Sequence, residues 1–306
     1  MKKYKLLTHN DLDGVSSSIL AQLLLRGNEI EVEYCNYDNI NDKVSSLTLN
    51  DLNTYERIFI TDISVSFEVA SSLNNLLEEN NIVDKVVLLD HHKTAIELNT
   101  FSWANVQVQL GDELCCGTRL FYNYLLRYTG YRPCEWLDEY VEIVNRYDTW
   151  LWNTKYNDLH PKKLNQLFYL LGRDKFIEYM LEKDEVKDDI LNAEDIKLLD
   201  EEDLKIERYI NGKEKTLNII TVDGFEIGVV FAEQYISELG NVLSERHREL
   251  SMIAIFNDGK VSLRTVRDDV DCSEFARRFG GGGHKKASGL SISSENMNKM
   301  LVNMFS

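Results

Sequence analysis

Carboxylate and imidazole side chains recur through the first half of this sequence, in short groups that lie far apart along the chain. Divalent cations such as Mn²⁺ and Mg²⁺ take carboxylate oxygens as ligands, and Mn²⁺ also accepts imidazole nitrogens. Two such ions about 3.5–4 Å apart hold a phosphate and generate the hydroxide that attacks it. The groups therefore predict a two-metal site for phosphoester hydrolysis, with the candidate residues His9, Asp11, Asp13, Asp62, Asp90, His91, His92 and Asp148.

Most of these residues come at the ends of segments that we expect to be β-strands or packed helices. Residues 57–61 and 85–89 are nearly continuous apolar runs, typical of central strands in a parallel sheet that is covered on both faces. Strands are also expected at residues 4–8 and 31–37, and helices at 14–25, 66–79, 114–128 and 135–147. This alternation predicts an α/β fold with a doubly wound, mainly parallel sheet.

The carboxyl ends of the expected strands carry several of the candidate residues. His9, Asp62 and Asp90 lie at such ends, which is where doubly wound sheets bind their ligands. Taken singly, an aspartate such as Asp62 is more often a helix cap or a turn residue than a metal ligand. The convergence of so many candidates on one edge of a sheet favours a shared site.

The second half of the chain has a different pattern. Residues 174–210 predict a charged helical connector, and two hairpins follow, around Val222-Asp223-Gly224 and around the strong turn signal Asn257-Asp258-Gly259. Helices are expected at 232–247, 272–279 and 295–305. We therefore expect a catalytic metal-binding domain at 1–185, a helical connector at 186–212, and a smaller α/β substrate-binding domain at 213–306.

Composition limits the classes of protein that this chain represents. It has 306 residues, of which 43% are hydrophobic, and no apolar run approaches the roughly 18 residues of a membrane span. The N-terminus lacks the apolar core of a signal peptide. The five cysteines are odd in number and form no C-x-x-C pair, so we expect reduced thiols in a cytoplasmic protein without a membrane partner.

Charge is distributed unevenly along the chain, whose net charge is −17. Residues 182–203 contain eleven acidic side chains against three lysines, whereas residues 264–286 contain six basic side chains against four acidic ones. An acidic protein is poorly suited to track along a long duplex, which requires a broad basic surface. A local basic region fits the capture of a short anion.

These motifs together resemble those of the DHH phosphoesterase family. The resemblance is carried by His9-x-Asp11-x-Asp13-Gly14, by Asp90-His91-His92 and by Asn145-Arg146-Tyr147-Asp148, and it covers nearly the whole chain. Ser262-Leu263-Arg264 and the stretch 280–289, which begins with four glycines before His284, resemble the DHH-associated C-terminal domain. One residue separates His9 from Asp11, whereas some branches of the family have three there.

The resemblance implies a role for each candidate residue. One metal ion would be held by His9, Asp11 and Asp62, and the other by Asp13, Asp62, His91 and Asp148, with Asp62 bridging the two. His92 would face the phosphate as a donor or general acid, and Asp90 would orient an imidazole. The implied substrate-binding residues are Arg264, Gly281, Gly282, Gly283 and His284, with the glycines forming a loop that lets the backbone approach an anion.

Within this family, a compact two-domain chain looks most like the nanoRNase type. We therefore expect a two-metal phosphodiesterase that uses Mn²⁺, with Mg²⁺ or Co²⁺ as alternatives. Its substrates would be short single-stranded oligonucleotides or dinucleotides, hydrolysed to nucleoside monophosphates, and also nucleoside 3′,5′-bisphosphates. A cyclic or linear dinucleotide phosphodiesterase and a non-catalytic nucleotide sensor remain alternatives. The sequence leaves a homodimer open.

Overall fold

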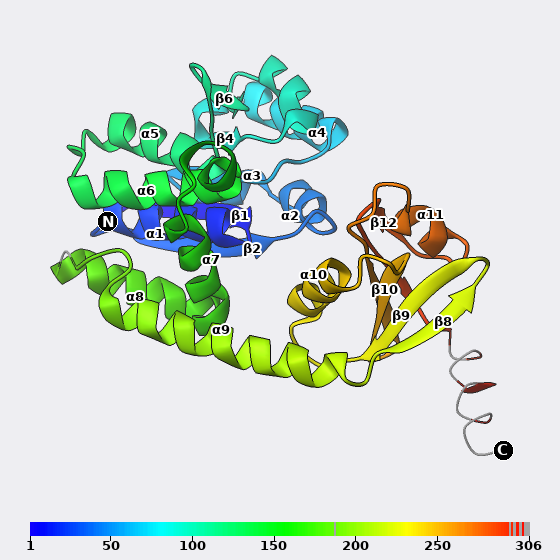
Figure 1. Ribbon diagram of the computed structural model, residues 1–306. Coiled ribbons are helices and arrows are strands. Elements are labelled where there is room, and N and C mark those ends of the chain that lie inside the picture. Colours follow the sequence, from blue (N-terminus) through cyan, green and yellow to red (C-terminus); the bar gives the residue numbers. More distant parts are fainter. Residues whose placement is uncertain (187, 294, 296–297, 300–301, 303–306) are drawn as a thin grey trace. The chain divides into compact units, whose positions relative to one another are not determined.

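The chain folds into two compact units that divide between Leu199 and Asp200. The computed structural model describes residues 1–186, 188–293, 295, 298–299 and 302, and Figure 1 gives the order of the elements. The division falls inside helix α9 (Ala193–Glu214), within the connector expected at 186–212, so the bounds of that connector stay a prediction. Each unit is described separately below.

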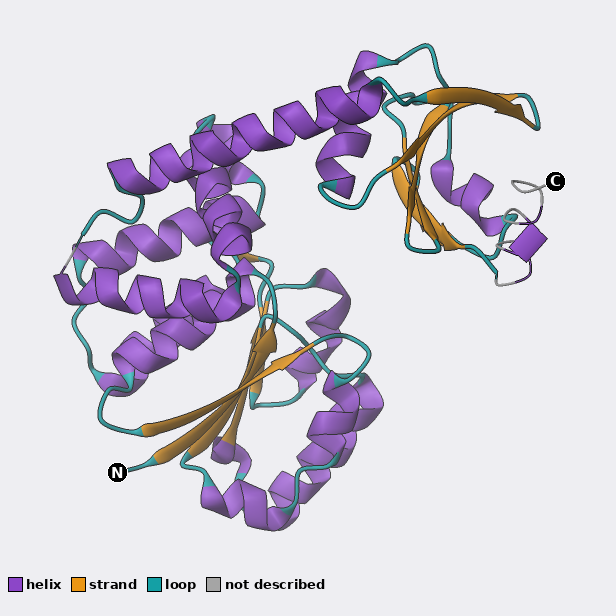
Figure 2. Cartoon of the chain, turned by 90° about the horizontal axis from the view of Figure 1, so that it is seen from below, coloured by secondary structure: helices purple, strands orange, loops and turns teal. Residues whose placement is uncertain are grey.

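A five-stranded parallel sheet forms the centre of the first unit, as seen almost edge-on in Figure 2. Its strands are β1 (Lys3–His9), β2 (Glu29–Cys35), β3 (Arg57–Thr61), β4 (Val86–Asp90) and β5 (Ala104–Val106), in the order β2-β1-β3-β4-β5. The chain leaves β1 toward one edge of the sheet and then returns to the other side of β1. The carboxyl ends of β1 and β3 therefore border the switch point where doubly wound sheets bind ligands.

Helices cover both faces of this sheet because alternate strand residues point to opposite faces. In β1, Leu6 belongs to the core beneath α1 (Leu12–Leu24), α5 (Gly117–Thr129) and α6 (Glu135–Asp148). Leu7 belongs to the opposite core, beneath α2 (Ile40–Ser45), α3 (Leu49–Thr54) and α4 (Phe67–Glu79). The expected doubly wound α/β fold is thus confirmed.

The remaining elements of the first unit extend these layers. Helices α7 (His160–Leu171) and α8 (Arg173–Val186) pack against α6 and α1. The short elements are the 3₁₀ helices η1 (Val83–Lys85) and η2 (Lys93–Thr100), the π-helix η3 (Trp152–Tyr156), and the strands β6 (Gln109–Leu110) and β7 (Glu113–Leu114). The start of α9 is anchored by a buried ion pair between Lys183 Nζ and Asp195 Oδ2 at 3.0 Å.

The second unit is a six-stranded mixed sheet between helices α10 (Ile236–Arg246) and α11 (Cys272–Arg277). Its strands are β8 (Asn218–Val222), β9 (Phe225–Phe231), β10 (Met252–Asn257), β11 (Lys260–Arg264), β12 (Gly282–His284) and β13 (Ala287–Ser291), in the order β12-β13-β11-β10-β9-β8. Only β9 and β10 pair in parallel. Their connection contains α10, as a parallel crossover requires.

Both expected hairpins of the second unit are present. The turn between β10 and β11 places Asp258 at φ 43° and Gly259 at φ 75°, the left-handed conformations that this turn requires. The glycine-rich stretch differs from expectation, because Gly282–His284 pairs with Ala287–Ser291 as a third hairpin instead of remaining a loop. Strand β5 and helices α2 and α3 were not expected. The helix predicted at 295–305 falls mostly on residues outside those that the structure describes.

Two further observations concern the chain's chemistry. All five cysteines are free thiols, and four of them are buried. Among the described residues, no helix combines the length and the apolar character that crossing a membrane demands.

Candidate metal centre

The structure gathers all eight candidate residues of the first half at the carboxyl edge of the parallel sheet. His9 ends β1, Asp62 directly follows β3, and Asp90 ends β4. Asp11 is the N-cap of α1 and Asp148 is the last residue of α6. Residues separated by more than a hundred positions in sequence thus form one cluster.

Side-chain distances divide this cluster into two groups that share Asp62. His9 Nδ1 lies 2.8 Å from Asp11 Oδ2 and 3.9 Å from Asp62 Oδ2. His91 Nε2 lies 3.2 Å from Asp62 Oδ1, 3.7 Å from Asp13 Oδ2 and 3.4 Å from Asp148 Oδ2. The potential ligand atoms of His9, Asp11 and Asp62 lie within 4.8 Å of one another, as do those of Asp13, His91 and Asp148. A third such group consists of Asp62, Asp90, His91 and His92.

The first turn of α1 is shaped by contacts that only a glycine permits. Gly14 donates its backbone N–H to Asp11 Oδ1 at 3.0 Å. A Cβ atom on Gly14 would lie 2.2 Å from the backbone oxygen of His9. The motif His9-x-Asp11-x-Asp13-Gly14 therefore depends on glycine at its end, because the helix folds back directly onto the strand.

Asp13 is held by the N-terminus of α5, far along the sequence. Its buried carboxylate accepts backbone N–H groups from Gly117 at 2.7 Å and from Thr118 at 2.8 Å. The partial positive charge at a helix N-terminus stabilises a carboxylate in this position. Gly117 also permits close packing on Asp62, since its Cβ would lie 2.6 Å from that of Asp62.

Asp62 and Asp148 show most clearly that the cluster concentrates negative charge in a buried place. Burial, followed by the charge of Asp13, raises the pKa of Asp62 well above its usual value. The same two causes raise the pKa of Asp148 to about 8. Within the described structure, Oδ2 of each carboxylate is buried without a hydrogen-bond partner. Four neighbouring carboxylates in such a setting fit divalent cations, which would neutralise and coordinate them.

The backbone at Asp62 is also strained. Its φ angle is 56°, in the left-handed region that few residues other than glycine adopt. Strain of this kind persists only where surrounding contacts hold it, and it concentrates at functional sites. Here the Asp62 N–H donates to the Leu89 carbonyl at 3.0 Å, which fixes the residue against the end of β4.

Asp90 and His92 form a pair at the rim of the cluster. Asp90 is fully buried, and its Oδ1 lies 2.7 Å from His92 Nδ1. Burial opposes ionisation of Asp90, but hydrogen bonds with His92 and Ser64 bring its pKa below the usual value. The hydrogen bond with Asp90 raises the pKa of His92 in turn. The pair favours an imidazolium, whose Nε2 lies at the rim, 3.2 Å from the Tyr37 hydroxyl.

Some of the supporting residues were not predicted as site residues. Ser64 hydrogen-bonds Asp90 Oδ2, and Asn145 Oδ1 accepts the Cys116 N–H at 2.9 Å. Asn145 has a signal in sequence, because it lies one helical turn before Asp148. Gly117 and Thr118 had no such signal, since their role depends on where the N-terminus of α5 lies in space.

The predicted substrate-binding residues lie together in the second unit. Arg264 pairs with Ala287 across β11 and β13, and Ala287 pairs with His284 across β13 and β12. Paired residues point to the same face of a sheet, so Arg264 and His284 share the face covered by α10. The guanidinium of Arg264 lies 3.5 Å from the Ser237 hydroxyl of that helix.

The glycines beside His284 have structural as well as possible binding significance. A Cβ on Gly281 would lie 2.2 Å from the Gly289 backbone oxygen, and one on Gly283, whose φ is 137°, would lie 2.7 Å from Ser288 Cα. A Cβ on Gly282 would meet no atom within 4 Å. Close packing of the hairpin therefore accounts for Gly281 and Gly283, whereas Gly282 has open space beside its backbone.

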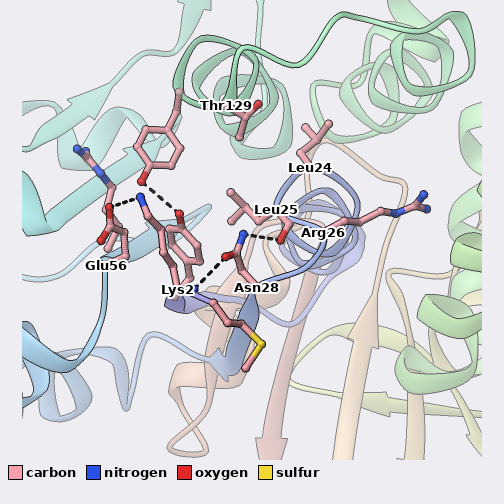
Figure 3. Close-up of a pocket in the computed structure, with 11 residues that line it drawn as sticks. Lys2, Leu24, Leu25, Arg26, Asn28, Glu56 and Thr129 are labelled. Carbon is pink, nitrogen blue, oxygen red and sulfur yellow. Dashed lines mark hydrogen bonds and ion pairs between the residues drawn. The ribbon is translucent and has the colours of Figure 1, made fainter.

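A separate cavity of about 540 Å³ lies at the opposite, amino end of the parallel sheet (Figure 3). Several of its polar groups pair with one another. Lys2 Nζ contacts Glu56 Oε1 at 2.7 Å, and Asn28 hydrogen-bonds both the Lys2 N–H and the Leu25 carbonyl. This cavity contains none of the predicted site residues.

Fold and site together define a phosphoesterase built on a doubly wound sheet, and comparison with known proteins gives the family. The DHHA1 domain family matches residues 232–305. Oligoribonuclease NrnB of Bacillus subtilis (strain 168) is 41% identical over 298 residues, which cover 95% of this chain and 73% of that protein. The chain belongs to the DHH family of phosphoesterases.

Solved structures show the same fold at low sequence identity. The crystal structure of exonuclease RecJ bound to manganese superposes with a TM-score of 0.58 at 14% identity, covering 98% of this chain and 88% of that chain. The pGpG-specific phosphodiesterase PggH from Vibrio cholerae superposes with a TM-score of 0.51 at 15% identity, covering 98% and 97%.

Proposed function

We propose that this protein is a metal-dependent phosphodiesterase that hydrolyses short oligonucleotides, including nanoRNA and dinucleotides, to nucleoside monophosphates. The observation that carries the proposal is the position of Asp62 between His9 and His91, one imidazole from each expected ligand group, beside two buried carboxylate oxygens that have no hydrogen-bond partner within the described structure. The similarity to oligoribonuclease NrnB supports short oligonucleotides as the substrate. The five free thiols support a reducing, cytoplasmic location.

Six side chains would hold the cations. His9, Asp11 and Asp62 would hold one, and Asp13, Asp62, His91 and Asp148 the other, with Mn²⁺ as the first choice because two imidazoles accompany the carboxylates. When bound, such ions supply a hydroxide nucleophile at neutral pH and positive charge across the phosphate. The N-terminus of α5 holds Asp13 in place for this task through two backbone hydrogen bonds.

Proton transfer to the leaving group falls to His92. Its Nδ1 is fixed by Asp90, which leaves the Nε2 proton of the imidazolium for the oxygen that departs from phosphorus. Asp90 is a positioning residue, because it sets the orientation and charge of this ring without reaching the substrate. Loss of the Asp90 hydrogen bond would remove both effects at once.

Arg264 and His284 would bind a second phosphate of the substrate. They lie on one face of the mixed sheet, two strands apart, with the open backbone of Gly282 on the same hairpin as His284. An arginine binds phosphate oxygens through a planar array of N–H donors. Recognition of a terminal or neighbouring phosphate would restrict the enzyme to short substrates, including nucleoside 3′,5′-bisphosphates.

The test is metal-dependent hydrolysis of RNA two to five nucleotides long, labelled at either end, with adenosine 3′,5′-bisphosphate and linear and cyclic dinucleotides assayed in parallel. We expect mononucleotide release that requires Mn²⁺ or Mg²⁺ and stops with EDTA. Preferential turnover of dinucleotides alone would narrow the function to a dinucleotide phosphodiesterase. Binding without turnover of any substrate would contradict the proposal and favour a nucleotide sensor.

A further inference from the structure

An exposed aromatic ring stands beside the metal centre and has no part in the chemistry described above. Tyr37 lies in the loop between β2 and α2, and 59% of its surface is exposed. Its ring centroid lies 5.5 Å from that of His9 and 6.1 Å from that of His92. Its hydroxyl lies 3.2 Å from His92 Nε2, the nitrogen assigned to the leaving group.

The loop holds this ring in a fixed position. Cys35 and Ile40 are buried at its two ends. Between them, Asn36 donates its N–H to Asn39 Oδ1 at 2.9 Å, and Asn36 O accepts the N–H groups of Asn39 and Ile40. Asn41 of α2 accepts the Ser66 N–H at 2.8 Å, which ties the loop to the segment that follows Asp62. These hydrogen bonds hold the turn in one conformation, so the fold itself keeps the Tyr37 ring exposed.

The phenol contributes a neutral surface to an otherwise charged rim. A tyrosine side chain carries no charge near neutral pH. An uncharged aromatic face stacks on a nucleobase, and proteins use such faces to bind single-stranded nucleic acids without reading their sequence.

We propose that the Tyr37 ring is a nucleobase-stacking subsite, which binds the base of the nucleoside attached to the leaving oxygen. The inference rests on the proposed function and adds to it a reason why nucleotides would be preferred over other phosphodiesters. Contact between the Tyr37 hydroxyl and His92 Nε2 places the ring within one nucleoside of the cleaved bond. Stacking would accept any base, because every base has an aromatic face.

Trp150 is another exposed aromatic side chain, and it is close to a metal ligand in sequence. It lies two residues after Asp148 and is 52% exposed. Its ring packs against that of Trp152, with centroids 4.9 Å apart. The observed contacts join Tyr37, and not Trp150, to the imidazoles of the centre, so Tyr37 is the stronger position for a stacked base.

The experiment measures equilibrium binding of a non-hydrolysable phosphonate-linked diadenosine, and of two analogues that lack either the first or the second base. Wild type, Tyr37→Phe and Tyr37→Ala are compared by calorimetry with Mn²⁺ and with EDTA. Tyr131→Ala is the matched control, because Tyr131 is 42% exposed and follows the far end of α5, about 18 Å of helix away from the centre.

We expect Tyr37→Ala to weaken binding of the complete ligand about tenfold or more, the loss that one base–aromatic stack produces. Tyr37→Phe and Tyr131→Ala should bind like wild type. Removal of the stacked base from the ligand should weaken binding to wild type and leave binding to Tyr37→Ala unchanged. Removal of the ring and removal of the base abolish the same stacking contact, so their effects should not add.

Three results would overturn the inference. One is unchanged affinity in Tyr37→Ala, and another is an equal loss in Tyr37→Phe, which would assign the effect to the hydroxyl and His92. The third is a base-removal penalty that persists in Tyr37→Ala, which would place the base elsewhere, with Trp150→Ala then testing that ring. Absence of metal-dependent turnover by wild type would refute the proposed function, whereas these binding results decide the stacking subsite independently.

Discussion

The two regions assigned to the substrate are built in opposite ways. The metal centre of the first unit is buried, has a strained backbone at Asp62, and contains carboxylates whose pKa values are raised. The Arg264–His284 face of the second unit lies on regular β-strands, and none of the buried unpaired polar atoms of the described structure belongs to it. The buried carboxylates of the first region need cations to balance their charge. The second region has no such requirement. Variants of the first unit should therefore lose mainly catalytic turnover, and variants of the second unit should lose mainly substrate affinity.

The largest effect is expected from Asp62→Asn, because its carboxylate contacts His9 and His91, one imidazole from each expected ligand group. Asparagine has the same shape and tolerates the left-handed backbone, so the variant should fold. Turnover should fall at least about a hundredfold, since even residues that only orient metal ligands cost that much. Without metal, its melting temperature should equal or exceed that of wild type, because one repelling carboxylate is gone.

Activity assays and thermal melts in EDTA check this prediction, with Asp112→Asn on an exposed loop as the control. Wild-type turnover in Asp62→Asn would remove Asp62 from the ligand set. A large drop in the melting temperature of the metal-free variant would show that the carboxylate has a structural role instead.

The next effect concerns pH and metal removal. The folded pKa values of Asp62 and Asp148 are raised above the unfolded value near 3.8, with that of Asp148 at about 8. The folded state therefore binds more protons, and the stability of the metal-free protein should fall as pH rises from about 4 toward about 8. Thermal melts should show this decline in EDTA and its loss or reversal with saturating Mn²⁺, which favours the ionised carboxylates.

The Asp148→Asn variant should show a shallower decline in EDTA than wild type. A metal-free wild-type protein that gains stability over the same pH range would contradict the electrostatic description of the centre.

A smaller effect is expected from Arg264→Gln, which retains the side-chain stem that packs against Gly240 of α10. Loss of charge-assisted hydrogen bonds to phosphate should raise KM about tenfold with a smaller change in kcat. The melting temperature should not change. Arg267→Gln, in which a surface ion pair with Asp269 is lost, is the control and should leave KM unaltered. A pure kcat defect in Arg264→Gln would show that this face takes part in the chemical step.

The smallest effect separates packing from binding within the glycine hairpin. Gly281→Ala should reduce the free energy of unfolding by about 1–3 kcal/mol, because the new methyl group overlaps the Gly289 backbone. Gly282→Ala should leave stability nearly unchanged and affect only substrate affinity. Denaturant melts and KM values of both variants test this division, and equal losses of stability would refute it.

Much of this architecture follows from local patterns in the sequence. The apolar runs at 57–61 and 85–89 predict central parallel strands, and their shared carboxyl edge predicts that Asp62 and Asp90 meet. The Asn257-Asp258-Gly259 turn predicts its hairpin correctly because these residues adopt positive φ readily. In each case the determining interactions lie within a few residues of one another.

Other features depend on contacts between residues that are distant in sequence, and no local sequence pattern predicts them. The N-terminus of α5 fixes Asp13 only because the fold brings Gly117 to it. The hairpin of Gly282–His284 has no apolar alternation, so four successive glycines suggested a loop. Tyr37 is the last residue of the strand expected at 31–37, and its proximity to His92 appears only when β2 and β4 take their places in the sheet.

The hydrogen bonds between Asp13 and the start of α5 join residues 104 positions apart, and the last ligand candidate is Asp148. During synthesis, the centre therefore cannot exist until α6 has emerged and docked. A nascent or partly folded chain has scattered carboxylates with ordinary affinity for cations, and contacts of such long range form slowly. Metal binding would then indicate that the first unit has folded. Misfolded chains would not bind the ion in this way, because their ligand side chains would not lie close together.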